Sequence, residues 1–103
     1  MYQISFYVPE KDLEKVKSAM FEAGAGHIGN YDCCSWQILG QGQFRPLAGS
    51  QPTIGSHGKV ETLAEYRVEM VCLEASLGAA IAAMKLAHPY EEVAYQVVQL
   101  END

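Results

Sequence analysis

The segment HPYEEVAYQVVQL, residues 88–100, predicts both the end of a helix and a β-strand. The ring of Pro89 disfavours helical dihedral angles in the residue before it, so a helix that reaches this segment should stop at His88. From Val93 to Leu100 the residues are mainly β-branched, aromatic or apolar, which is typical of a strand. The segment also concentrates titratable side chains, so it is the first place to look for a functional site.

Hydrophobic periodicity predicts the elements ahead of this segment. Alternating apolar residues mark strands, and apolar residues at helical spacing mark helices. In chain order these elements are a strand at 2–8, a helix from Pro9 to the glycines at 24 and 26, a strand near 31–40, a strand at about 62–72 and a helix over 74–87. With the last strand the order is βαββαβ, the ferredoxin-like arrangement of the α+β class. It predicts a four-stranded antiparallel sheet with both helices on one face.

Length and composition predict one domain over residues 1–103. The net charge of −6 argues against a nucleic-acid partner, because a phosphate backbone attracts Lys and Arg. No apolar run approaches the roughly 20 residues that span a bilayer, and the N-terminus has no feature of a secretory signal. The 3 cysteines suit buried thiols in a reducing compartment. We therefore expect a cytoplasmic protein with neither a nucleic-acid nor a membrane partner.

Residues 40–59, between the second and third predicted strands, are rich in Gly, Pro, Ser and Gln. So long a connection is unusual in a compact domain, and it is either a flexible surface excursion or a functional loop. Its apolar residues Phe44, Leu47 and Ile54 favour a functional loop, because a disordered linker has no need of them. The candidate ligand-binding residues of this loop are Gly42, Phe44, Pro46 and Gly55.

The sheet face that turns away from the helices is predicted to mix polar, charged and aromatic residues. They are Gln3, Ser5, Tyr7, Glu65, Arg67 and Glu69. This mixture is too polar for a buried core and too aromatic for a fully solvated surface. We therefore expect another copy of the chain to cover part of this face, and Glu69 is a candidate ligand-binding residue on it.

Three strings in a fixed order tie the chain to a known family. They are GAGHIGNY at 24–31, GQGQF at 40–44 and HPYEE at 88–92. Across about residues 2–100 the chain resembles the inserted domain of the NGG-one-interacting-factor-three-like family, in its short stand-alone version often called YqfO-type. The tripeptide at 88–90 also resembles the CutA divalent-ion tolerance proteins. Both groups are similar in fold to the PII signalling proteins.

This resemblance implies a trimer that binds a small ligand or a metal ion at a cleft between subunits, with residues 40–60 as the long loop of those relatives. Two departures limit what it implies. Full-length family members carry a dinuclear metal centre on two flanking lobes, for which this chain has no room, so a hydrolase or cyclohydrolase activity is not expected. CutA proteins have a proline near the start of the last strand, where this chain has Val93 and Ala94, and this weakens an inference of copper tolerance.

His88 has two interpretations. A protonated imidazole at a helix C-terminus is stabilised by the helix dipole, by up to about 2 kcal/mol, so the residue can simply cap its helix. Alternatively, His88 binds a ligand or handles a proton together with Glu91 or Glu92. These adjacent glutamates should point to opposite faces of a strand, so they do not form a paired-carboxylate site. Tyr90 should be half-buried with its hydroxyl hydrogen-bonded. The four residues are the candidate ligand-binding residues of this segment.

A divalent metal ion, zinc or copper, is the cofactor that these residues could hold. His88, His27 and Glu92 are the candidate ligands across a subunit interface, because imidazole and carboxylate groups suit both ions. No His-x-His or His-x-x-x-His pair supports such a site.

No complete constellation of nucleophile and base is readable, so we expect no enzymatic activity. The leading hypothesis is a homotrimeric PII/CutA-like module that binds a small ligand or a divalent metal ion at a subunit cleft. A metal-tolerance protein and a protein-interaction module are the alternatives.

Overall fold

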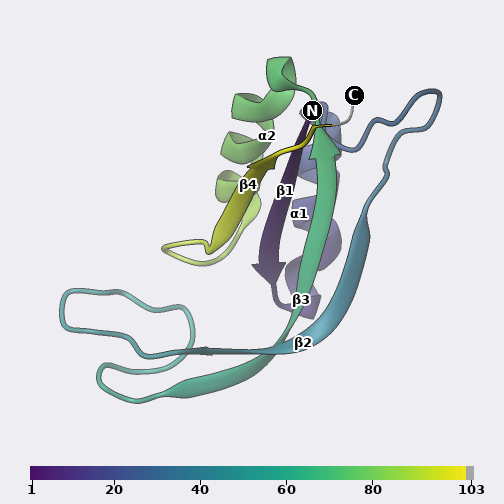
Figure 1. Cartoon of the computed structure of the whole chain (residues 1–103). Coiled ribbons are helices and arrows are strands. Elements are labelled where there is room, and N and C mark those ends of the chain that lie inside the picture. The colour runs from purple at the N-terminus through teal and green to yellow at the C-terminus, as the bar shows by residue number, and fades with distance from the viewer. Residues whose placement is uncertain (102–103) are drawn as a thin grey trace.

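The computed structural model describes residues 1–101, and its elements follow the predicted βαββαβ order (Figure 1). The elements are β1 (Tyr2–Val8), α1 (Glu10–Glu22), β2 (Trp36–Phe44), β3 (Glu61–Cys72), α2 (Glu74–Ala87) and β4 (Tyr95–Gln99). The sheet order is β2-β3-β1-β4, and all neighbouring strands are antiparallel. The predicted α+β, ferredoxin-like fold is therefore confirmed.

Both helices pack on one face of the sheet and enclose the apolar core (Figure 1). The inward row of β1 is Ile4, Phe6 and Val8, and all three are fully buried. Residues opposite each other in register share a sheet face, so Met70 and Val68 of β3 lie beside Ile4 and Phe6. Burial of each such side chain stabilises the fold by roughly 1.5–3 kcal/mol. Within residues 1–101, neither helix has the length and apolar character needed to cross a membrane.

β2 begins later than the predicted strand near 31–40. The residues before Trp36 form a turn in which the Cys34 N–H donates to the Gly26 carbonyl (2.9 Å). Cys33 has a φ of 54°, a left-handed conformation that a strand residue does not adopt. Cys33 is exposed and Cys34 half-buried, so the prediction of buried thiols is correct only for Cys72. The alternation of apolar residues in this stretch gave no sign of the turn.

β2 also ends later than predicted, because the GQGQF string is strand rather than loop. It pairs with β3 as far as Phe44, which lies opposite Glu61. β1 pairs with β3 only from Tyr66 onward. The ends of β2 and β3 therefore project beyond the sheet as a two-stranded ribbon, and the connecting loop shrinks to residues 45–60 (Figure 1).

The last strand is shorter than the predicted range of 93–100, since β4 covers Tyr95–Gln99. Just beyond it, the Leu100 N–H donates to the Met1 carbonyl (2.9 Å). Met1 and Leu100 consequently lie side by side.

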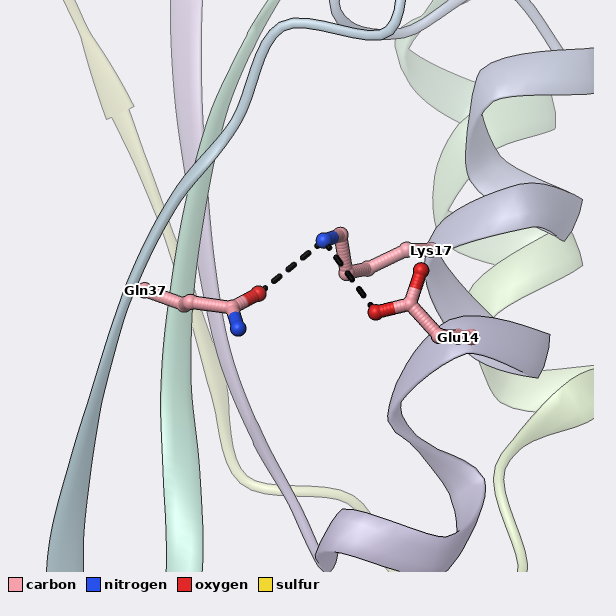
Figure 2. A network of polar contacts seen from close by, with 3 residues as sticks. All are labelled: Glu14, Lys17 and Gln37. Carbon is pink, nitrogen blue, oxygen red and sulfur yellow. Dashed lines mark hydrogen bonds and ion pairs between the residues drawn. The ribbon is translucent and has the colours of Figure 1, made fainter.

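A polar network fastens β2 to α1 (Figure 2). The Lys17 ammonium donates to the Gln37 side-chain oxygen (3.0 Å) and forms an ion pair with Glu14 (3.5 Å). The Lys17 side chain is only 14% exposed, so its charge is largely withdrawn from water. This network holds the edge strand in place and lies on the helix side of the sheet.

The outer sheet face is the one that turns away from the helices, and it exposes large apolar side chains. Trp36 lies opposite Glu69 and Ile38 opposite Arg67, so both apolar residues belong to this face. Trp36, Ile38 and Val98 are 59%, 53% and 52% exposed. Between the apolar residues, Arg67 and Glu69 form an ion pair (3.1 Å).

Candidate ligand-binding pocket

A pocket of about 480 Å³ lies where the end of the β2–β3 ribbon, the 45–60 loop and the segment after α2 meet. We call it the corner pocket. The sheet contributes Tyr7, Phe44 and Glu65, which lie on the outer sheet face. The loop and the segment after α2 supply most of the remaining lining, including Pro46, Leu47, Pro52, Ile54, Tyr90, Glu91 and Glu92. The volume falls in the range of roughly 300–1,000 Å³ that is usual for small-molecule sites.

Two long-range hydrogen bonds hold the loop against the segment after α2. The Gln51 N–H donates to the Glu91 carboxylate (2.9 Å), and the Thr53 hydroxyl donates to the Pro89 carbonyl (2.9 Å). Within the loop, His57 Nε2 bonds to the Ser50 carbonyl (2.7 Å). The loop is thus tethered to this corner, although most of its residues are exposed, and the tether makes the pocket.

His88 is a buried structural residue that contacts two lining residues of the corner pocket, Tyr7 and Tyr90. The Tyr90 N–H donates to its Nδ1 (3.2 Å), so the ring proton resides on Nε2, which donates to the Tyr7 carbonyl (2.7 Å). The residue is 6% exposed, and this burial lowers the pKa of the imidazole, although the Tyr7 bond and the Asp12 carboxylate oppose the shift. His88 is therefore a neutral link between the end of β1 and the segment after α2. Only its backbone N–H bonds to α2, at the Met84 carbonyl (2.9 Å), so the predicted cap by a charged imidazole is not what the side chain provides.

Tyr90 and Glu65 bring two perturbed groups to the pocket wall. Burial raises the pKa of Tyr90 to about 12, with help from the Glu65 and Asp12 carboxylates. Burial also raises the pKa of Glu65, and interaction with Tyr90 opposes that shift. Among the described residues, the Tyr90 hydroxyl has no hydrogen bond of good geometry, in contrast to the prediction, despite the proximity of Glu65. A buried hydroxyl without a partner is unusual, because leaving it unpaired costs about 1–3 kcal/mol.

The sequence predicted several of the lining residues correctly. Tyr90, Glu91, Glu92, Phe44 and Pro46 all line the corner pocket. Both glutamates do so because they lie in a bend before β4, where the alternation expected of a strand does not apply.

Three other candidates lie next to the pocket or away from it. Gly55 packs near Phe44, and Gly42 is so close to Glu65 that a Cβ there would overlap the carboxylate. Neither glycine lines the pocket. Glu69 is paired with Arg67 on the outer sheet face, outside the lining.

The predicted metal ligands do not assemble within one chain. His27 is exposed in the turn before β2, whereas His88 is buried at the end of α2. Nowhere in residues 1–101 do three or more His, Cys, Asp or Glu side chains come close enough together to hold a metal ion.

Sequence reasoning missed other lining residues. Tyr7 had been placed on the outer sheet face, but nothing along the chain connected it with the 45–60 loop. Leu47, Pro52 and Ile54 also line the pocket, and the only sign of them was that apolar residues are out of place in a solvated loop.

Comparison with known proteins identifies close relatives of this chain. It is 51% identical over 94 residues to a protein of Mycobacterium tuberculosis named GTP cyclohydrolase 1 type 2 homolog, with 91% of this chain and 25% of that protein covered. A Bacillus subtilis protein of the same name is 43% identical over 99 residues, with 96% and 26% covered. The chain therefore spans about a quarter of the length of the curated relatives it matches. A scan against models of protein families found no match.

Solved structures place the fold in the same context. A Bacillus cereus protein related to NIF3 superposes with a TM-score of 0.85 at 40% identity, covering 98% of this chain and 26% of that protein. The CutA protein of Archaeoglobus fulgidus superposes with a TM-score of 0.71 at 15% identity, covering 100% of this chain and 87% of that one. The resemblance drawn from the sequence is confirmed. The chain is homologous to one segment of the NIF3-related, YqfO-like proteins, and its fold is of the CutA type.

Proposed function

We propose that this chain is a non-catalytic module that self-associates as a homotrimer and binds a small ligand in the corner pocket. The observation that carries the proposal is the closure of the 45–60 loop onto Glu91 and Pro89, which turns the end of an open sheet into a pocket of about 480 Å³. A merely solvated loop would have no need of hydrogen bonds to residues 36 and 40 positions away.

The lining of the corner pocket supports binding more than chemistry. No His or Cys side chain is part of the described lining, so it has neither an imidazole base nor a thiol nucleophile. The hydroxyls of Ser50 and Thr53 already donate to backbone carbonyls. The relatives named as cyclohydrolase homologs are proteins of which this chain spans about a quarter. We therefore assign the segment a binding role.

Self-association is the second part of the proposal, and the outer sheet face supports it. Trp36 and Ile38 lie opposite Glu69 and Arg67 on this face, and each apolar side chain is more than half exposed. Large exposed apolar groups on one face mark interaction surfaces. We propose that other copies of the chain cover these residues. We also propose a cytoplasmic location, where the thiols of the 3 cysteines would stay reduced.

Sedimentation equilibrium combined with tryptophan fluorescence tests the assembly. Trp36 is the only tryptophan, so a shift of its emission to shorter wavelength with rising concentration would report its burial between copies. We expect a trimer for the wild-type chain and a monomer for Trp36→Glu. The matched control is Leu86→Glu on α2, because Leu86 is 90% exposed on the opposite side of the sheet and should not affect assembly. A wild-type monomer at tens of micromolar, or equal disruption by both variants, would contradict the proposal.

A further inference from the structure

The aromatic and acidic residues of the corner pocket indicate which charge its ligand carries. Three aromatic side chains, Tyr7, Phe44 and Tyr90, line the same pocket as the carboxylates of Glu65, Glu91 and Glu92. The one basic side chain among the described lining residues is the exposed Arg45. Aromatic faces and carboxylates both attract cations, whereas an anionic ligand would meet an excess of negative charge.

The neighbouring basic residue does not change this balance. Arg67 lies 6.0 Å from the centre of the Tyr7 ring, which is the contact a cation makes with an aromatic face. Its guanidinium, however, is paired with Glu69 (3.1 Å) and is not part of the pocket lining. The Arg67 guanidinium therefore already contacts the Tyr7 ring on the outer sheet face. Glu65, in contrast, has no basic partner among the described ion pairs.

The spacing of the carboxylates distinguishes between kinds of cation. No three acidic side chains of residues 1–101 are close enough to share a metal ion. A metal ion needs several oxygen ligands at about 2–2.6 Å from one point, and the described residues contain no acidic cluster of that kind. A bulkier organic cation is different, because its charge is spread over several carbon atoms and is satisfied by separated carboxylates and aromatic faces.

From these observations we infer that the corner pocket binds a small organic ammonium ion with an apolar arm. This inference rests on the ligand binding proposed above and specifies its chemical class. The ammonium group lies among the aromatic rings and Glu65, and the arm lies along the apolar loop side chains Leu47, Pro52 and Ile54. Part of the Glu91 carboxylate is already used by the Gln51 N–H, so Glu65 is the main counter-charge.

The inference is tested by NMR at pH 7.5: three probes, each containing a benzene ring, are titrated into the ¹⁵N-labelled chain, and the amide chemical shifts are followed. The probes are benzyltrimethylammonium, benzyl alcohol and benzoate. We expect the cation to shift the amides of Phe44, Glu65 and Tyr90 and to bind about tenfold more tightly than the other two probes. Glu65→Gln should weaken cation binding about tenfold, and Phe44→Leu should weaken it several-fold. The control Glu22→Gln, exposed on α1, should bind the cation like the wild type.

The three probes separate the possible failures. Equal or tighter binding of benzoate or benzyl alcohol at the same amides would overturn the cation inference and leave the pocket as a ligand site. No shift of the pocket amides with any probe would overturn the inference and count against the proposed pocket as well. Unchanged cation binding by Glu65→Gln would remove the counter-charge on which the inference depends.

Discussion

The neutral His88 makes the stability of this fold sensitive to mild acid. Its Nδ1 accepts the Tyr90 N–H, so a second ring proton would break that bond and place a charge on a residue that is 6% exposed. The fold therefore lowers the pKa of His88 below its ordinary value of about 6.5. A lowered pKa means that the unfolded chain binds the proton first as the pH falls. The stabilisation is complete above about pH 6.5 and declines below it.

The size of this effect follows from one proton. The free energy of unfolding changes by at most about 1.4 kcal/mol per pH unit for each proton that is bound on unfolding. As the pH falls below 6.5, the wild-type chain should therefore lose stability because of His88, with a slope no steeper than this limit. For a domain whose total stability is roughly 5–15 kcal/mol, such a loss is easily measured.

The variant His88→Gln isolates this contribution. The glutamine amide can donate to the Tyr7 carbonyl in place of Nε2 but does not titrate. We expect the variant to lose about 1–2 kcal/mol at pH 7.5, chiefly for the Tyr90 N–H left without an acceptor. Urea denaturation of both chains between pH 7.5 and 5 would show a smaller pH dependence for His88→Gln. Glu65, whose raised pKa acts in the opposite direction, is common to both chains and cancels in the difference. Parallel pH profiles for the two chains would refute the lowered pKa of His88.

Further predictions concern the core, the turns and the loop. Phe6→Ala should lower the free energy of unfolding by about 3–5 kcal/mol in urea titrations, because Phe6 is fully buried, and a loss below 1 kcal/mol would contradict its place in the core. Gly26→Ala should cost more stability than Gly29→Ala, since both have positive φ but only the added Cβ at Gly26 would meet other atoms, at 2.8–3.0 Å; similar thermal denaturation midpoints would contradict this. Thr53→Val removes the hydroxyl that donates to the Pro89 carbonyl, so amide hydrogen exchange in the 45–60 loop should speed up while exchange in β1 stays unchanged.

The elements that the sequence predicted best are those whose ends are set by local chemistry. The helix over 74–87 was correct at both ends, and its C-terminal end is set by Pro89, which restricts the residue before it regardless of the rest of the fold. The strand at 2–8 was also correct, since its alternation matches one buried and one outer face. In both cases a few neighbouring residues decide the structure.

The loop predicted from Gly40 onward was wrong at its start, because pairing with another strand overrides local preference there. The glycines of GQGQF suggested a loop, yet Gly40 and Gly42 pair with β3 opposite Glu65 and Leu63. Backbone hydrogen bonds to a partner strand can hold glycine in an extended conformation despite its low strand propensity. No local pattern reports such a partner.

The corner pocket was also predicted only as far as local sequence allows. Its acidic and aromatic residues after α2 were recognisable as a cluster, because they are neighbours in the sequence. The convergence of Tyr7, Phe44 and Ile54 was not, since it depends on the fold-back of the 45–60 loop. Candidate residues were thus visible one by one, but the enclosure that unites them is a property of the folded chain.

The hydrogen bond between Leu100 and Met1 has an architectural consequence. A domain whose two ends meet can be spliced into a host polypeptide at a single point, because the host chain leaves and returns at nearly the same position without being stretched. By the same reasoning, joining these ends with a short linker and opening the chain elsewhere should yield a circular permutant that keeps its sheet. The domain is therefore suited to insertion as one unit within a longer polypeptide.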